Sequence, residues 1–329
     1  MINIKKNPEL KTVYFINFMG MPDSYFYDIT AHRDGLAKPF VYLREQIEKA
    51  GYLVKLTNDC SNLTDVAAII SFSNINYTIL RNLKKHPKYK CIIGLFEPPV
   101  QLPYLYDPVL KEYFGSILTM FDDQIDNETY FKLHNPQSRE AITDNIPDFD
   151  QKKFCIMIQT NGNKNKQPKE LYSERYRLAK YLSETSEFDL FGAGWEDISS
   201  WRGPLKIDKL KTLKNYKFSI TYENMRDQLG YVTEKIFDPL FAGCVPIYWG
   251  ASNITKYIPA ECFIDRRNFS SNEELHQFLK SVDRAAFNQY IEAAKTFIQS
   301  EQYQPYTFSG FAKPFLERLN SIKMQSAHF

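Results

Sequence analysis

The stretch from residue 216 to residue 269 constrains the fold most strongly, because two apolar runs in it flank one helical pattern. Phe218–Tyr222 is a β-branched and aromatic run typical of a strand, and a second apolar run covers Cys244–Trp249. Between them, Thr233–Ala242 carries its apolar residues at helical spacing, and Gly243 supplies a stop. The pattern predicts strand, loop, helix and strand. Such a unit crosses over right-handed, so both strands are parallel and their carboxyl ends share one edge of a sheet.

The loop and the helix start of this unit are where we expect a ligand. Open α/β sheets bind ligands at the carboxyl edge, and a helix start offers backbone N–H groups and the positive end of the helix dipole, which suits a phosphate. The same residue types are common on an ordinary solvated helix, so the local pattern leaves both interpretations open. The candidate residues are Glu223, Asn224, Arg226 and Tyr231 in the loop, and Thr233, Glu234 and Lys235 in the first turn.

The rest of the chain alternates strands and helices, which is typical of parallel α/β domains. Its 329 residues suit about two domains, which we place at 1–150 and 151–329, with helices from 272 to 322 at the end of the second. Residues 121–152 have no sustained apolar period and predict an irregular connection. The other strands are expected at Thr12–Phe18, Leu53–Thr57, Ala67–Phe72, Lys90–Phe96, Ser116–Met120, Lys153–Gln159 and Phe188–Phe191, and the other helices at Phe40–Ala50, Tyr77–His86, Lys169–Ser183 and Asp208–Tyr216.

The composition narrows the class of protein. Hydrophobic residues make up 43% and charged residues 24% of the chain, as in soluble globular proteins, and a net charge of +2 argues against a nucleic-acid-binding surface. The first ten residues are polar, and no run approaches the roughly eighteen apolar residues of a spanning helix. We therefore expect a cytoplasmic location. The five scattered cysteines form no C-x-x-C pair and predict reduced core thiols.

A further candidate residue, outside this unit, is Glu97, which follows the strand at Cys91–Phe96. Pro98 and Pro99 come directly after it and fix the backbone. A general base needs its carboxylate held within hydrogen-bond reach of one hydroxyl, and a rigid position at the carboxyl end of a strand meets that need. A glutamate before prolines is also an ordinary turn residue, so the local pattern does not decide between these interpretations.

Three other segments carry partial signals for ligand chemistry. The long aromatic loop at 19–38 follows the first strand, and its rings suit stacking on sugar faces, unless the loop is only variable decoration. Asp122 and Asp123 are adjacent, instead of in the D-x-D spacing that holds a divalent ion, so we expect no metal site. Gly192 and Gly194 lack the third glycine of a dinucleotide fingerprint and predict a tight turn.

Four ordered blocks of the chain point to a family. They read F-x-x-x-Y-E-N, Y-V-T-E-K, A-G-x-V-P-I-Y-W-G and P-x-x-x-F-I-D, spread over about fifty residues. Together they resemble the donor-binding signature of the α-1,3/1,4-fucosyltransferase family, including its bacterial members. The resemblance implies an α/β fold of two Rossmann-like parallel-sheet domains facing a cleft, the GT-B arrangement, with C-terminal helices. The donor would lie on the second domain and the acceptor on the side of the first.

The same resemblance implies an activity. It is that of an inverting α-1,3-fucosyltransferase, which moves L-fucose from GDP-β-L-fucose to a hydroxyl of a galactose- or N-acetylglucosamine-containing glycan and requires no metal cofactor. Family members have an Arg seven residues before a Leu on a helix, and Arg175 with Leu182 is similar, after a basic, amide-rich loop at 161–166, whereas Arg177 does not fit. On residues alone, such an arginine is more often a solvated one.

The resemblance also gives each candidate residue a role. Glu97 would be the general base for the acceptor hydroxyl. The departing diphosphate would be stabilised by Arg175, Lys235 and the helix start at Thr233, while Glu234 would hold a ribose or fucose hydroxyl, Tyr231 would lie against the nucleotide, and Glu223 and Asn224 would line the same pocket.

Two other functions stay open. A related transferase for another GDP-sugar would keep Arg175 and Lys235, because these two residues would bind the diphosphate, which all GDP-sugars share. A non-catalytic sugar- or nucleotide-binding module would need neither a base nor these cations. Some bacterial members of the family carry heptad repeats and a basic amphipathic tail for membrane attachment. This sequence shows neither, which argues against membrane association and leaves peripheral attachment at the inner membrane as the alternative.

Overall fold

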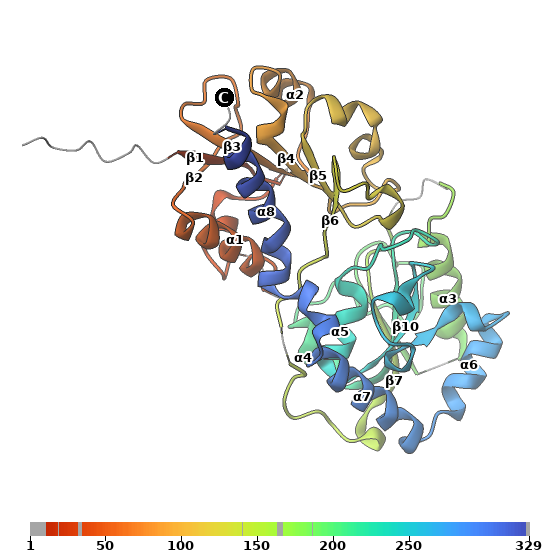
Figure 1. The fold of residues 1–329 in the computed structure, drawn as a ribbon. Helices are drawn as coiled ribbons and strands as arrows, with labels where there is room; N and C mark the ends of the chain where they lie inside the picture. Colours follow the sequence, from red (N-terminus) through yellow and green to blue (C-terminus); the bar gives the residue numbers. More distant parts are fainter. Residues whose placement is uncertain are drawn as a thin grey trace, which may run out of the picture. The chain divides into compact units, whose positions relative to one another are not determined.

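The computed structural model describes residues 11–18, 20–31, 35–139, 141–162, 167–185 and 187–326 (Figure 1). The chain forms two compact units. Unit 1 consists of Met1–His134 and Phe308–Phe329, and unit 2 of Asn135–Thr307. Each unit contains one parallel sheet that is packed between helices, so the predicted class of two Rossmann-like α/β domains is confirmed.

Unit 1 is built on a sheet of six parallel strands in the order β2-β1-β3-β4-β5-β6. The order changes direction between β1 and β3, because the chain first adds β2 on one side of β1 and then continues on the other side. The strands are β1 Thr12–Ile16, β2 Leu53–Leu56, β3 Val66–Phe72, β4 Cys91–Gly94, β5 Ser116–Thr119 and β6 Tyr130–Lys132, and the helices are α1 Lys38–Lys49, α2 Tyr77–Leu83 and α8 Phe308–Ser326.

The two faces of the unit 1 sheet are covered by different helices. Side chains of a strand alternate between faces, so Val13 and Phe15 of β1 pack in one core with α1 and α8. Tyr14 and Ile16 pack in a second core with α2. Burial on both faces explains why these strands read as nearly continuous apolar runs in the sequence.

Unit 2 contains five parallel strands in the order β11-β10-β9-β7-β8. Here the order changes direction between β7 and β9. The strands are β7 Lys153–Ile158, β8 Phe188–Phe191, β9 Tyr216–Tyr222, β10 Val245–Trp249 and β11 Ile264–Asp265, and the helices are α3 Tyr172–Thr185, α4 Lys209–Leu213, α5 Glu234–Ala242, α6 Asn272–Ser281 and α7 Arg284–Ile298. The strand, loop, helix and strand predicted for residues 216–249 are β9, α5 and β10.

The division into units differs from the boundary at residue 150 that the sequence suggests. Residues 135–150 belong to unit 2, where the Gln137 amide donates to the Tyr306 carbonyl at 2.8 Å. The last helix, α8, belongs to unit 1, because Phe311 and Phe315 pack into the core under its sheet. The connection also contains β6, whose three side chains are all half-buried, so no apolar alternation marks it in the sequence.

The chain bends after β8 at Gly192, as predicted. Its φ is +126°, and a Cβ there would meet the Gln159 carbonyl oxygen at 2.0 Å. We expect Gly192→Ala to lower the free energy of unfolding by about 3 kcal/mol or more, because backbone strain and steric overlap add. Gly203 has a φ of +86°, and a Cβ there would have no atom within 4 Å, so Gly203→Ala isolates the strain. This strain is about 1–2 kcal/mol. Equal losses in urea denaturation of the two variants would contradict this account.

Lys152 ties together two segments of unit 2 from a buried position. Its side chain is 6% exposed, and its ammonium donates to the carbonyls of Lys214 and Gly243. Burial, assisted by the charge of Lys214, lowers the pKa of Lys152 to about 8. An unfolded chain keeps this proton up to a pKa of about 10.4. Between these two pKa values the unfolded chain binds more protons, so the stability contributed through this group rises with pH.

This shift predicts a pH-dependent difference between the natural chain and Lys152→Met. From about pH 7.5 to about pH 10.5, the natural chain should gain about 2–3 kcal/mol of unfolding free energy relative to the variant. Urea unfolding of both proteins at steps of half a pH unit measures the difference, and effects of the other titrating groups cancel in it. A difference that stays constant over this range would show that folding does not lower the pKa of Lys152.

Candidate functional site

The candidate site of unit 2 lies where the strand order of its sheet reverses. Ligands of open α/β sheets bind in the crevice outside the carboxyl ends of the strands at such a point. β7 ends at Ile158 and is followed by Gln159, whereas β9 ends at Tyr222 and is followed by Glu223. The two strand ends are joined by a hydrogen bond of 2.8 Å from Gln159 Nε2 to the Tyr222 carbonyl. Topology therefore brings the predicted loop to the ligand-binding edge.

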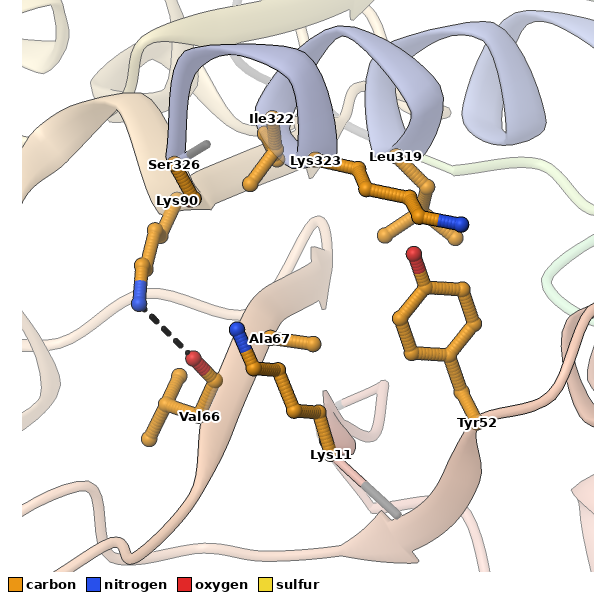
Figure 2. A pocket seen from close by; sticks show the side chains of 9 residues that line it. All are labelled: Lys11, Tyr52, Val66, Ala67, Lys90, Leu319, Ile322, Lys323 and Ser326. Carbon is orange, nitrogen blue, oxygen red and sulfur yellow. Dashed lines mark hydrogen bonds between the residues drawn. The ribbon is translucent and has the colours of Figure 1, made fainter. Parts of the chain in front are cut away.

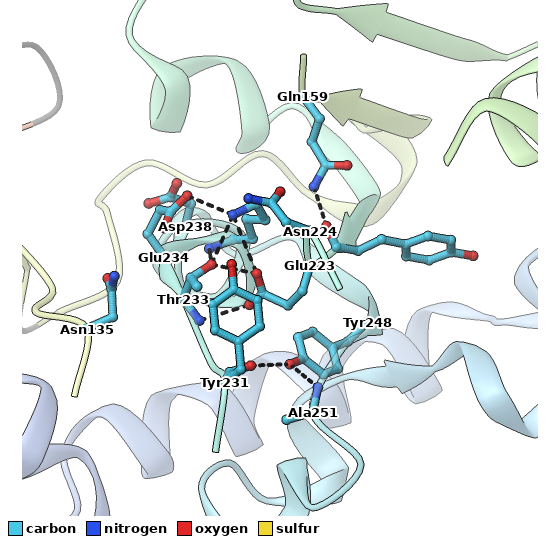
Figure 3. A network of polar contacts seen from close by, with 12 residues as sticks. Asn135, Gln159, Glu223, Asn224, Tyr231, Thr233, Glu234, Asp238, Tyr248 and Ala251 are labelled. Carbon is cyan, nitrogen blue, oxygen red and sulfur yellow. Dashed lines mark hydrogen bonds and ion pairs between the residues drawn. The ribbon is translucent and has the colours of Figure 1, made fainter. Parts of the chain in front are cut away.

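Glu223 fixes the start of α5 (Figure 3). Its side chain is fully buried, and its two carboxylate oxygens accept hydrogen bonds from Thr233 N at 2.8 Å and Thr233 Oγ1 at 2.7 Å. The ammonium of Lys235 lies 3.4 Å from Glu223 Oε2. Burial raises the pKa of Glu223, while Lys235 and the hydrogen bonds from Thr233 act in the opposite direction. A buried carboxylate with these partners holds the helix start in one conformation.

The first turn of α5 carries a cation between two carboxylates. Lys235 Nζ lies 3.3 Å from Glu234 Oε1 and 3.1 Å from Thr233 Oγ1, in addition to its contact with Glu223. Burial by itself raises the pKa of Glu234, but the charges of Lys235 and Lys209 outweigh it and hold this pKa at about 2. Glu234 is therefore ionised near neutral pH, and an ionised carboxylate accepts hydrogen bonds from hydroxyls.

Arg175 reaches the same edge from α3, but it does so from inside the unit. The side chain is 2% exposed, and its Nη2 donates to the Tyr222 carbonyl at 2.7 Å and to Asn224 Oδ1 at 2.9 Å. The guanidinium lies over the Tyr172 ring, 4.7 Å from its centre. Burial lowers the pKa of Arg175, yet an arginine stays charged in proteins. The solvated helix arginine of the sequence alternative is excluded by this burial.

The Nε of Arg175 is buried and has no hydrogen-bond partner among the residues that the structure describes. The Oε1 of Gln159 is in the same state. Buried polar atoms without partners are rare in folded proteins, and they indicate a function or an additional partner. Both of these atoms belong to side chains that bind the Tyr222 carbonyl, at the point where the strand order reverses.

Tyr231 and Asn224 are also placed at the site, with little exposed surface. Tyr231 is 1% exposed, and its carbonyl accepts a hydrogen bond of 3.4 Å from the Tyr248 hydroxyl. Asn224 is 9% exposed and holds Arg175 through its Oδ1. The structure thus brings seven of the eight predicted residues of unit 2 to one strand edge and one helix start. The eighth, Arg226, is exposed and pairs with Asp227 at 3.4 Å. The individual roles of the seven toward a nucleotide stay predictions.

Glu97 belongs to unit 1, where it follows β4 by three residues and is half-buried. The turn after it is held by the Pro98 carbonyl, which accepts from the amides of Gln101 at 2.9 Å and Leu102 at 3.0 Å. The hydroxyl of Tyr106 donates to the Glu97 carbonyl at 2.8 Å. These bonds fix the backbone at Glu97, which is the rigidity that the sequence interpretation requires. Its role as a base stays a prediction.

Lys209, Asp238 and Gln159 belong to this region, but no signal in the local sequence pattern pointed to them. Lys209 of α4 pairs with Asp238 of α5 at 2.5 Å and, through its charge, lowers the pKa of Glu234. Gln159 directly follows strand β7 at the reversal point, and knowledge of the strand order would have identified it.

Residues 163–166 of the basic loop expected before α3 lie outside the described residues.

One of the two adjacent acids, Asp122 and Asp123, is bound to a lysine. Asp122 forms an ion pair of 2.8 Å with Lys132 of β6. Among the residues that the structure describes, no three His, Cys, Asp or Glu side chains are grouped as metal ligands would be. In the same part of the chain, no helix has both the length and the apolar composition needed to cross a membrane.

Comparison with solved structures identifies the fold. The match to a crystal structure of an α1,3-fucosyltransferase covers 97% of this chain and 93% of the solved chain, with a TM-score of 0.59 and 15% identity. The match to the structure of an α1,3-fucosyltransferase with GDP-fucose covers 96% of this chain and 92% of the solved chain, with a TM-score of 0.59 and 17% identity. At these identities the similarity shows the fold alone, and it confirms the GT-B class.

Sequence relatives match the chain over shorter stretches. An alpha-(1,4)-fucosyltransferase of Arabidopsis thaliana is 40% identical over 80 residues, which are 24% of this chain and 20% of the relative. A 4-galactosyl-N-acetylglucosaminide 3-alpha-L-fucosyltransferase 9 of Mus musculus is 30% identical over 138 residues, or 41% of this chain and 34% of the relative. The chain thus spans about a third or less of the length of these curated relatives.

The family model described as glycosyltransferase family 10 (fucosyltransferase), C-terminal part, matches residues 128–314. This range is more than half of the chain and contains β7 to β11 with the whole candidate site of unit 2. The chain therefore belongs to glycosyltransferase family 10, the fucosyltransferases.

Proposed function

We propose that the chain transfers L-fucose from GDP-β-L-fucose to a hydroxyl of a galactose- or N-acetylglucosamine-containing glycan, forming an α-1,3 linkage with inversion at the anomeric carbon. One observation carries the proposal. The buried Glu223 locks Thr233 at the start of α5, so that this helix start and Lys235 are fixed at the reversal point of the sheet, inside the range matched by the family model. A fixed helix start with a lysine suits a diphosphate.

The donor is assigned to the groups at this helix start. The α5 amides and Lys235 bind the diphosphate, and Lys235, whose side chain is 16% exposed, exchanges its contact with the more exposed Glu234 for phosphate oxygens. The ionised Glu234 accepts from a ribose or fucose hydroxyl. Tyr231 and Asn224 line the part of the donor pocket that holds the nucleotide. A solved relative of the same fold is described with GDP-fucose, which supports this donor.

The reaction follows from charge movement. Glu97 takes the proton of the acceptor hydroxyl, the oxygen attacks the anomeric carbon of fucose, and the bond from that carbon to the diphosphate oxygen breaks, so that GDP leaves with the bonding electron pair. Negative charge grows on the diphosphate, and preorganised cations and dipoles stabilise it. Lys235 and the α5 start supply this stabilisation directly, each worth about 2–4 kcal/mol if removed. Arg175 adds a buried positive charge below the loop.

The proposal includes neither a metal ion nor a nucleic acid. The charge of the leaving diphosphate is met by a lysine, an arginine and backbone amides, which makes a metal ion unnecessary in this scheme. We place the reaction in glycan biosynthesis, on a protein or lipopolysaccharide acceptor. We place it in the cytoplasm because the five cysteines are buried free thiols, which suit a reducing compartment.

The test is an assay of the purified protein with GDP-fucose against lactose and N-acetyllactosamine in the presence of EDTA. Release of GDP above the blank without acceptor is expected. Competition by GDP-mannose and other GDP-sugars then measures which donor the protein prefers. If one of these GDP-sugars bound more tightly than GDP-fucose, its sugar would take the place of fucose in the proposal. Calorimetric binding of GDP without acceptor-dependent release would contradict the acceptor assigned here. Absence of both would contradict the transferase proposal as a whole.

A further inference from the structure

Unit 1 contains a cavity of about 190 Å³ beneath the end of α8 (Figure 2). Its walls come from segments far apart in the sequence. Lys11 precedes β1, Tyr52 precedes β2, Lys90 precedes β4, and Lys323 lies on α8. The apolar part of the wall includes Leu319 and Ile322 of the same helix. The cavity therefore lies at the amino ends of the strands.

Three lysines line this cavity, and no acidic side chain among the residues that the structure describes does so. Lys90 Nζ donates to the Val66 carbonyl at 2.9 Å, as Figure 2 shows. In the described ranges, from residue 11 to residue 326 with their gaps, none of Lys11, Lys90 and Lys323 forms an ion pair with a carboxylate. Elsewhere in unit 1, by contrast, Arg44 and Lys132 have carboxylate partners.

Lys11 and Lys323 are exposed and Lys90 is half-buried. Like charges gathered around one small cavity repel each other. Such a cluster is stabilised when an anion binds between its members. Lysine is a common phosphate ligand, acting as a point charge with three donors. The cavity has room for about six water molecules, enough for a phosphoryl group and a few further atoms. Tyr52 offers a hydroxyl donor beside the cations.

We propose that the cavity lined by Lys11, Lys90 and Lys323 binds a phosphate monoester. The anion joins the ammonium of α8 to two ammonium groups at the amino ends of β1 and β4. It therefore stabilises the packing of α8 on the sheet of unit 1. Because a ligand that binds only the folded state raises the free energy of unfolding by RT ln(1 + L/Kd), where L is the free ligand concentration, the melting temperature reports the binding.

This site is distinct from the groups of the proposed transfer reaction. Lys90 directly precedes β4, whereas Glu97 follows the same strand, so the two residues belong to opposite edges of the sheet. The donor groups all belong to unit 2. The proposal therefore stands or falls independently of the fucosyl transfer.

The test uses the full chain and inorganic phosphate as the probe, at constant ionic strength set with chloride. Calorimetry and thermal unfolding are recorded for the natural chain, Lys11→Gln, Lys323→Gln and the control Lys313→Gln, an exposed lysine of the same helix that does not line the cavity. Saturable binding and a raised melting temperature are expected for the natural chain and the control. Each cavity variant should bind phosphate about tenfold more weakly, as expected for loss of one charge-assisted hydrogen bond.

Two further arms separate the possible sources of the phosphoryl group and the two sites. Phosphatidylcholine vesicles with and without phosphatidate are tested by flotation. Binding to the phosphatidate vesicles that the cavity variants lose would identify a lipid headgroup, and binding to free phosphate alone would identify a soluble monoester. GDP affinity should be the same in all four proteins. Equal phosphate affinity in the cavity variants and the control, or no saturable binding to the natural chain, would overturn the proposal.

Discussion

Replacement of Glu97 by alanine is expected to remove fucosyl transfer while leaving the affinity for GDP nearly unchanged. A positioned general base contributes about 10²–10⁴-fold to the rate, so kcat should fall by this factor. GDP binding should persist because every group assigned to the donor belongs to unit 2, whereas Glu97 belongs to unit 1. Steady-state kinetics with GDP-fucose and N-acetyllactosamine, together with calorimetry of GDP, measure both quantities.

Two further variants make this result specific. Glu97→Gln keeps the size and the backbone turn of Glu97 but cannot take a proton, so it should lose as much turnover as the alanine variant. Glu112→Ala removes an exposed carboxylate of the same unit and should retain normal kinetics. If Glu97→Gln kept most of the turnover, the carboxylate would not be the base, and the rigid turn after β4 would be its only role.

Replacement of Lys235 by alanine is expected to weaken GDP binding and turnover together. The ammonium lies at the start of α5, within 3.4 Å of Glu223 and 3.3 Å of Glu234. Its loss removes a charge-assisted bond to the diphosphate, which should weaken GDP binding about 10–100-fold. The loss of charge stabilisation in the transition state should lower kcat by about 10²–10³-fold.

The same substitution leaves the buried Glu223 without its ammonium neighbour, so stability must be measured alongside activity. Lys235→Met retains part of the aliphatic packing, and Lys211→Ala removes an exposed lysine of nearby α4 as a matched control. GDP affinity that falls in Lys235→Met but not in Lys211→Ala, at equal melting temperature, supports the role. An equal loss of GDP binding in Lys235→Ala and Glu97→Ala would contradict the division of roles between the two residues.

The order of elements in this chain could be predicted from its sequence because it depends on short-range patterns. The apolar spacing of Thr233–Ala242 predicts α5, and the N-cap at Thr233, whose side chain accepts from the Lys235 amide, is a local interaction. The helix ends at Gly243, whose φ of +61° only glycine adopts readily. Parallel strands follow from the crossover rule, and this rule alone places the loop after β9 at a ligand-binding edge.

The tertiary structure alone decided which side chains meet. Arg175 and Asn224 are 49 residues apart, and their contact, with the burial of the guanidinium, depends on how α3 packs on the sheet. The Lys209–Asp238 pair and the burial of Lys152 depend in the same way on packing between segments that no periodicity connects. α8 follows unit 2 in the chain but completes the core of unit 1, and this placement creates the lysine-lined cavity. Local propensity acts over a few residues, whereas burial and charge pairing are set by the whole packed unit, so the sequence determined the elements and their order and the tertiary structure decided their side-chain partners.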